Sequence, residues 1–133
     1  MKSKIYFPIL VFTSLFLASC TGEVLTEDDD GTRVEYAIGS EFKVQLKGNP
    51  DAGFMWKTVG LNRNVVEQKG EPVIRTAAET GEDYGTYTFT FETVSAGNEV
   101  LRLMYYDKNA EDPKPEKTIG IEVISGTMGR IQS

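Results

Sequence analysis

Residues 85–91 read GTYTFTF, so aromatic and threonine side chains alternate through the stretch without a break. Successive side chains of a β-strand point to opposite faces, which places Tyr87, Phe89 and Phe91 together on one face. A strand with one apolar and one polar face is typical of an antiparallel sheet packed on one side only. The stretch therefore predicts a strand of an all-β protein.

The same period of two recurs along the chain. Alternating apolar positions occupy residues 34–38, 42–47, 101–105 and 119–123, and less regular apolar stretches at 55–61 and 65–74 complete a set of about seven strands. Residues 75–80 have the composition of one short helical turn. Seven short strands with a single tryptophan predict an immunoglobulin-like β-sandwich. One cysteine forms no internal disulfide, so apolar packing has to hold the core together.

Composition excludes whole classes of chemistry. The 133 residues contain no histidine, which removes Ser-His-Asp and Cys-His catalysis and every histidine metal site. Residues 107–112 begin like a calcium loop, but Asp112 stands where glycine is needed and Thr118 stands where a bidentate glutamate belongs. No phosphate-binding glycine loop is present. The sequence predicts a protein that is not an enzyme and has no metal and no cofactor.

The N-terminus has the pattern of an export signal. Lys2 and Lys4 precede an apolar run over residues 5–18 that is too short to span a membrane but long enough for a signal peptide. The run ends in Leu17-Ala18-Ser19-Cys20, which resembles the bacterial lipobox, and this resemblance implies cleavage after residue 19 and lipid attachment at Cys20. We therefore expect a membrane anchor through Cys20 in the bacterial cell envelope, at the outer membrane or the cell surface. The alternative is an ordinary secretory signal with an unmodified cysteine.

Four segments follow from these patterns: a signal peptide at 1–19, a lipid-anchored acidic tether at 20–32, an immunoglobulin-like domain at 33–125 and a polar tail at 126–133. The tether contains the acidic run at residues 27–30. The full chain carries a net charge of −6, and loss of Lys2 and Lys4 with the signal leaves −8. Such a charge is a poor match for nucleic acid, and we expect a monomeric domain without a nucleic-acid partner.

The most distinctive segment is Gly48-Asn49-Pro50-Asp51-Ala52-Gly53-Phe54-Met55-Trp56. Proline fixes φ at position 50, glycine permits a positive φ at position 53, and Asn49 is suited to capping the turn through its side chain. These residues predict a stiff, narrow loop between two strands. Trp56 is interpreted as a core residue of the sandwich.

The spacing Asn-Pro-x-x-Gly-x-x-Trp resembles the first signature of the chagasin-like inhibitors of papain-type cysteine proteases. The likeness extends over residues 34–124, although only this first motif is specific. In that family three loops at one end of an immunoglobulin-like domain block the protease cleft. The resemblance implies three protease-binding segments here: Asn49, Pro50, Asp51, Ala52, Gly53 and Phe54; then Gly81, Glu82, Asp83, Tyr84 and Gly85; then Tyr106, Asp107, Lys108 and Asn109.

The third segment departs from the family pattern, which has Arg-Pro-Trp where this chain has Asp107-Lys108-Asn109. Arginine and tryptophan anchors commonly dominate the energy of an interface, so their loss bears on function. Two hypotheses therefore stand. The first is an exported, lipid-anchored inhibitor that blocks papain-like cysteine proteases reversibly with its loops. The alternative is a non-catalytic immunoglobulin-like lipoprotein that binds a different ligand.

Overall fold

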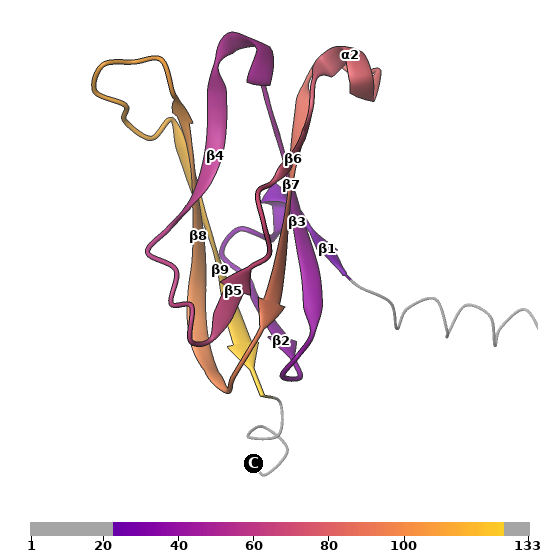
Figure 1. The fold of residues 1–133 in the computed structure, drawn as a ribbon, viewed down its shortest axis with the longest axis vertical. Coiled ribbons are helices and arrows are strands. Elements are labelled where there is room, and N and C mark those ends of the chain that lie inside the picture. The colour runs from indigo at the N-terminus through magenta and orange to yellow at the C-terminus, as the bar shows by residue number, and fades with distance from the viewer. Residues whose placement is uncertain (1–22, 127–133) are drawn as a thin grey trace, which may run out of the picture.

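The computed structural model describes residues 23–126, which form nine strands in two facing sheets (Figure 1). The strands are β1 (Val24–Leu25), β2 (Arg33–Tyr36), β3 (Glu41–Gly48), β4 (Phe54–Val59), β5 (Val66–Gln68), β6 (Val73–Arg75), β7 (Gly85–Thr93), β8 (Gly97–Asp107) and β9 (Lys117–Ser125). One sheet runs β1-β3-β7, with β5 and β6 both pairing with β7, and the other runs β2-β9-β8-β4. Short helical turns lie at η2 (Glu27–Asp29), η3 (Pro50–Ala52) and α2 (Ala77–Thr80).

This architecture confirms the predicted all-β sandwich, with two strands more than the expected seven. The apolar stretch at 65–74 divides into β5 and β6, which pair with different halves of β7. The other additional strand, β1, carries no alternation of its own. Most neighbouring strands are antiparallel, but β1 runs parallel to β3 and β2 runs parallel to β9, so both sheets are mixed. The predicted helical turn near residues 75–80 is confirmed as α2.

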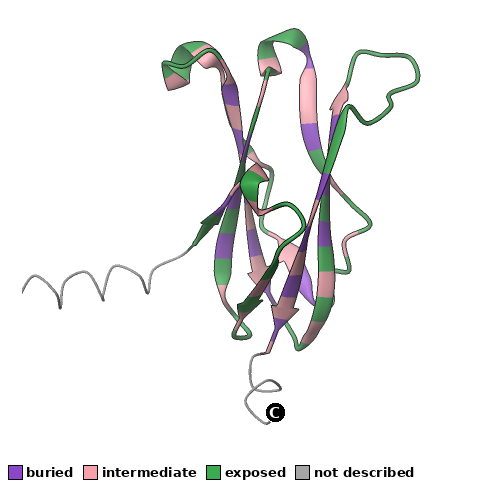
Figure 2. Cartoon of the chain, turned by 180° about the vertical axis from the view of Figure 1, so that it is seen from behind, coloured by how far each residue is buried: buried purple, intermediate pink, exposed green. Residues whose placement is uncertain are grey.

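Inward-facing side chains of the two sheets form one core. Burial alternates residue by residue along β3, β7 and β9, as the purple bands in Figure 2 show. Trp56 is 1% exposed, which confirms that it is a core residue. The core comprises Leu25, Phe42, Val44, Leu46, Trp56, Val65, Val66, Tyr87, Phe89, Phe91, Leu101, Leu103, Tyr105, Ile119, Ile121 and Val123.

The prediction of a free acidic tether over residues 20–32 is wrong for residues 23–32, which belong to the folded domain. Leu25 is 2% exposed and pairs with Val44 of β3. The Glu27 carboxylate accepts the Lys47 backbone N–H at 2.9 Å and lies 3.4 Å from the Lys117 ammonium. Backbone pairing and these contacts hold a segment that composition alone marks as solvated.

Several sequence predictions lie outside the described residues. The signal peptide at 1–19, the lipid site Cys20 and residues 127–133 of the predicted tail are among them. Between residues 23 and 126, no helix has the length and apolar character required to cross a bilayer.

Replacing Leu25 with alanine tests whether the N-terminal segment is part of the fold. We expect Leu25→Ala to lower the free energy of unfolding by ~2–4 kcal/mol, because it empties a buried site in the core. Val24 is the matched control, since it lies in the same short strand but is 52% exposed. We expect Val24→Ala to change stability by less than ~0.5 kcal/mol. Urea denaturation of both variants measures the difference, and equal small effects would show that β1 contributes nothing.

Candidate functional site

Three loops meet at one end of the sandwich. They are the β3–β4 connection at Asn49–Gly53, the connection from β6 to β7 at Thr76–Tyr84, and the β8–β9 connection at Lys108–Glu116, all at the top of Figure 1. We call them the wedge, the second loop and the third loop. The pairing of Gly48 with Gly85 and of Phe54 with Asp107 brings their ends to the same level. The three predicted segments thus lie at one end of the molecule.

The wedge is a closed turn built as the sequence predicts. Asn49 precedes η3, and its side-chain oxygen accepts the Ala52 N–H at 3.3 Å. Pro50 opens the turn, and its carbonyl accepts the Gly53 N–H at 3.0 Å. Gly53 ends the turn at φ 90°, a left-handed conformation that favours glycine. Asp51 and Ala52 are exposed at its outer side.

Three hydrogen bonds from buried side chains hold both ends of the wedge. The Trp56 indole N–H donates to the Lys47 carbonyl at 3.0 Å, and the Asn49 N–H donates to the Tyr105 hydroxyl at 2.8 Å. On the other side the Tyr87 hydroxyl donates to the Phe54 carbonyl at 2.5 Å. The Trp56 and Tyr87 bonds each join one sheet to the other, and the Tyr105 bond ties the first wedge residue to β8, so the wedge is fixed to both layers.

The aromatic rings that carry these bonds pack against one another. Tyr105 stacks on Phe54 with ring centroids 5.1 Å apart, contacts Trp56 at 5.0 Å and meets Tyr87 edge-on at 6.4 Å. Burial, with smaller contributions from Tyr105 and Asp51, raises the pKa of the Tyr87 phenol. The Tyr87 hydroxyl therefore keeps its proton, which it needs as a donor.

Two paired glycines leave room for this arrangement. A Cβ at Gly48 would lie 2.6 Å from Tyr105 Cε1 and 2.7 Å from Tyr87 Cε1. A Cβ at Gly85 would lie 2.7 Å from Cδ of Pro50 and would overlap the Arg75 carbonyl oxygen. Any larger residue at either position would displace the tyrosines or the wedge.

The second loop is ordered by its own polar groups. Thr76 and Glu79 cap α2 reciprocally, and the Thr80 hydroxyl donates to the Tyr84 carbonyl at 2.8 Å. Glu82 and Asp83 are exposed at its turn, whereas Tyr84 is half-buried under the Lys47 ammonium at 4.6 Å. Of the residues predicted here, Gly85 is buried and belongs to β7. The exposed part of this segment is therefore residues 81–83.

The third loop begins later than the sequence predicts, because β8 continues to Asp107. Tyr106 lies within that strand and faces outward from the sandwich, with its ring 4.9 Å from the Lys57 ammonium. Phe54 is likewise a strand residue, half-buried against Tyr105. Both rings therefore belong to strands and pack against neighbouring side chains, and neither is part of the third loop. Lys108 and Asn109 are the exposed residues that open the loop.

Acidic groups outnumber basic groups at this end of the protein. The wedge, the second loop and the third loop contain Asp51, Glu79, Glu82, Asp83, Glu111, Asp112 and Glu116, against Lys108 and Lys114. Within the described part of the chain, no three metal-ligating side chains converge on a point that would hold an ion. All seven acids are exposed, and Glu79 also caps α2.

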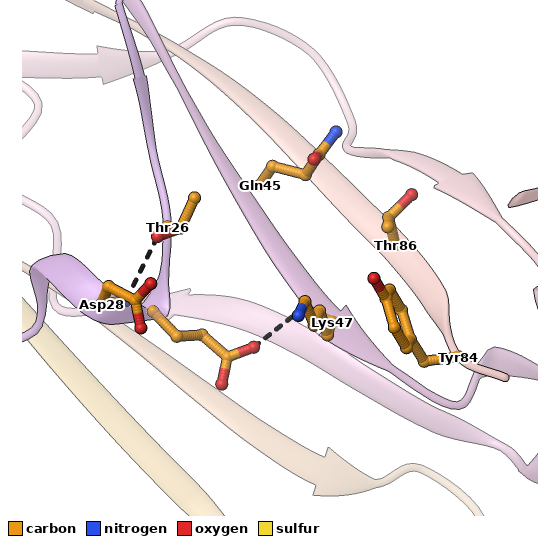
Figure 3. A pocket seen from close by; sticks show the side chains of 7 residues that line it. Thr26, Asp28, Gln45, Lys47, Tyr84 and Thr86 are labelled. Carbon is orange, nitrogen blue, oxygen red and sulfur yellow. Dashed lines mark hydrogen bonds between the residues drawn. The ribbon is translucent and has the colours of Figure 1, made fainter. Parts of the chain in front are cut away.

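A pocket of about 210 Å³ lies on the outer side of the β1-β3-β7 sheet, below the second loop (Figure 3). It is lined by Thr26, Glu27, Asp28, Gln45, Lys47, Tyr84 and Thr86. Its volume is below the usual range for small-molecule sites. Lys47 and Tyr84 contact each other across it, and Glu27 is engaged with the Lys47 backbone. We assign it no cofactor.

The structure also identifies supporting residues that the motif does not reveal. Tyr87 and Tyr105 occupy inward positions of alternating strands, which predicts burial, and nothing in that pattern shows that their hydroxyls reach the wedge. Their hydrogen bonds join residues separated by 33 and 56 positions. Such contacts depend on the facing of two sheets and are not encoded in any local motif.

Comparison with known proteins places this geometry among protease inhibitors. Residues 35–123 match the family described as "Chagasin family peptidase inhibitor I42". No curated protein sequence matches the chain. The cysteine protease inhibitor EhICP2 from Entamoeba histolytica has a similar solved structure, with 16% identity and a TM-score of 0.67, covering 80% of this chain and 97% of that one.

Two further solved structures are similar. Amebosin matches at 25% identity with a TM-score of 0.54, covering 78% of this chain and 97% of its own. PbICP-C, solved in complex with falcipain-2, matches at 12% identity with a TM-score of 0.50, covering 78% of this chain and 99% of its own. At 12–16% identity, EhICP2 and PbICP-C support the shared fold alone.

Substitution of Gly85 tests the packing beneath the wedge. We expect Gly85→Ala to lower the free energy of unfolding by ~1–3 kcal/mol, because the added methyl group collides with Pro50 and the Arg75 backbone. Gly120→Ala is the matched control, since a Cβ at that strand glycine would lie 3.5 Å from the nearest atom, in Val100. We expect the control to be within ~0.5 kcal/mol of the parent protein. Chemical denaturation measures the free energy of unfolding of both variants. An unchanged value for Gly85→Ala would show that the wedge shifts freely to make room for the methyl group.

Proposed function

This chain belongs to the chagasin family of peptidase inhibitors, and on that premise we propose that it inhibits papain-like cysteine proteases reversibly by inserting its wedge into the active-site cleft. The family consists of inhibitors, so the protein is not an enzyme. The observation that carries the proposal is the closed turn at residues 49–53, fixed to both sheets and flanked by two loops at the same level.

The solved relatives support the choice of partner. EhICP2 is described as a cysteine protease inhibitor, and PbICP-C was solved in complex with falcipain-2. For this chain, they favour a cysteine protease as the partner that binds the loop end. We propose one wedge per cleft, with a standard interface of ~800 Å² on each partner.

The wedge blocks the cleft without serving as a good substrate. A protease cleaves a segment whose scissile carbonyl settles into the oxyanion hole. Here the Pro50 carbonyl is already bonded to the Gly53 N–H, and Gly53 has a left-handed φ, so the peptide is folded back on itself. The turn fills the cleft, but its peptide bonds are not aligned with the oxyanion hole. Because it is ordered beforehand, binding costs little conformational entropy.

Each loop has a distinct part in this proposal. The exposed wedge residues Asp51 and Ala52, with Pro50, enter the catalytic centre. Glu82 and Asp83 of the second loop contact one wall of the cleft, and the third loop lies towards the other. The acidic character of all three loops adds long-range attraction or repulsion that depends on the charge of the protease and on salt.

A second candidate function rests on the sequence of the third loop. Asp107-Lys108-Asn109 stands where the family pattern has Arg-Pro-Trp, and no aromatic ring from Phe54 or Tyr106 takes that place. An inhibitor-like domain without its usual anchor suits a binding module for a different ligand. Inhibition assays separate the two functions.

Exchanging one wedge side chain tests the proposed inhibition. We expect the chain from Thr21 to Ser133, which retains every described element, to inhibit papain reversibly and competitively. Ala52→Arg should raise the inhibition constant at least ~30-fold, equivalent to ~2 kcal/mol, because the wedge tip no longer fits the cleft. Ala96→Arg is the matched control, since Ala96 is also exposed but lies in the turn between β7 and β8 at the opposite end.

Steady-state titration of papain and of a cathepsin L-like enzyme measures both variants. Equal inhibition by the two variants would place the binding surface elsewhere on the domain. No inhibition by the parent protein of either enzyme would remove the proposal and favour the binding-module function.

We further propose that Cys20 carries a lipid that holds the protein in the bacterial cell envelope. Only Thr21 and Gly22 separate Cys20 from Glu23, whose carbonyl accepts the Lys43 N–H at 3.0 Å. Three residues reach at most ~11 Å, so the lipid would keep the β1 edge of the domain close to the bilayer. The wedge begins six residues beyond Lys43 along β3, a rise of ~20 Å. Anchoring thus leaves the loop end displaced from the point of attachment.

Labelling with a palmitate analogue in an expressing bacterium tests the anchor. We expect the full chain to take up label and to partition into the detergent phase of Triton X-114, because several acyl chains on one residue anchor stably. Cys20→Ala should lose both properties, and Thr21→Ala should retain them. Unlabelled parent protein in the aqueous phase would support the ordinary secretory signal instead.

A further inference from the structure

Asp107, at the end of β8, lies directly beside the point where the wedge returns to the sheet. Its register partner is Phe54, the first residue of β4. The chain that leaves β8 therefore has to run along the flank of the wedge. Asp107 is half-buried there, whereas Lys108 and Asn109 after it are exposed.

The side chain of Asp107 folds this segment into a tight turn. Its carboxylate oxygen accepts the Asn109 N–H at 3.0 Å, and its carbonyl accepts the Ala110 N–H at 3.3 Å. A carboxylate that accepts the N–H two residues ahead forms an Asx turn, which orders a short stretch of backbone. The turn directs Asn109 back towards the wedge.

The turn makes two contacts with Gly53. The Lys108 N–H donates to the Gly53 carbonyl at 3.0 Å, one step beyond the last paired residues of the β4–β8 ladder. The Asn109 carboxamide lies so close over the Gly53 α-carbon that a Cβ there would overlap it. Gly53 is consequently buried, although its neighbours Asp51 and Ala52 are exposed. The third loop therefore covers the residue that closes the wedge.

We propose that Asp107, Lys108 and Asn109 form a brace that holds the wedge in its binding conformation before a protease arrives. This rests on the proposed inhibitory function and assigns the segment a positioning role instead of a grip on the protease. A wedge that is ordered only part of the time binds more weakly in proportion to its ordered fraction. Loss of the brace therefore slows association, while the contacts that set dissociation stay in place.

Substitutions at the brace distinguish positioning from direct contact. We expect Asp107→Ala and Asn109→Ala to reduce the association rate with papain about tenfold and to change the dissociation rate less than threefold. Asp107→Asn should behave as the parent protein, because its amide oxygen accepts the same hydrogen bond. Glu41→Ala is the control, since Glu41 is an exposed acid at the start of β3, at the end of the strand away from the wedge.

Amide hydrogen exchange on the free protein provides a readout that needs no protease. We expect the Lys108 amide, which donates to Gly53, to exchange about tenfold faster in Asp107→Ala and at the parent rate in Asp107→Asn and Glu41→Ala. Unchanged exchange in Asp107→Ala would overturn the brace.

The kinetic outcomes are equally decisive. A rise confined to the dissociation rate would identify the segment as a direct grip on the protease. If the association rate falls as much in Asp107→Asn as in Asp107→Ala, the charge of Asp107 matters and the turn does not. If the parent protein leaves papain uninhibited, the proposed function fails, and the exchange experiment still decides whether the brace exists.

Discussion

Three polar atoms on buried aromatic rings connect the core of this sandwich to its loop end. Trp56, Tyr87 and Tyr105 are each buried in the core, yet each places one hydrogen-bonding atom against the backbone at the base of the wedge. An unpaired polar atom at such a depth costs ~1–3 kcal/mol, so the rings and the wedge stabilise one another. The conformation of the loop is therefore a property of the core and not of the loop residues alone.

The N-terminal segment covers one edge of the sheet that contains β3 and β7. A strand edge left open is a template for pairing with another chain, and the short β1 covers part of the β3 edge. Beyond β1, Glu27 accepts a backbone N–H of β3 and Asp30 accepts the Gly120 N–H of β9. The acidic run thus supplies acceptors where the two sheets approach each other. Acids in such positions satisfy backbone groups, which is why their charge does not make the segment a free tether.

Alternation and turn chemistry predict the parts of the fold that local sequence controls. The inward positions of β3 and β7 and the capped turn closed by Gly53 follow from residue type and spacing. The strand β1 does not, because two residues carry no period and its pairing depends on a partner elsewhere in the chain. The start of the third loop is misplaced for the same reason, since pairing with Phe54 extends β8 to Asp107. What sequence reasoning misses in the site is the set of contacts made between distant segments.

Resistance to cleavage and readiness to bind arise from a single constraint in the proposed inhibitor. To be cut, the wedge would have to open into an extended strand. Opening breaks the hydrogen bond between Pro50 and Gly53 and the hydrogen bonds that Tyr105 and Tyr87 make with the wedge and its end. To bind, it has to be closed already, and the same bonds close it. Because the exposed wedge residues are small or acidic and the third loop contains no tryptophan, the proposed affinity depends on shape and prior order more than on a large anchor. In the proposed mechanism, inhibition is limited to proteases whose clefts match an already closed turn.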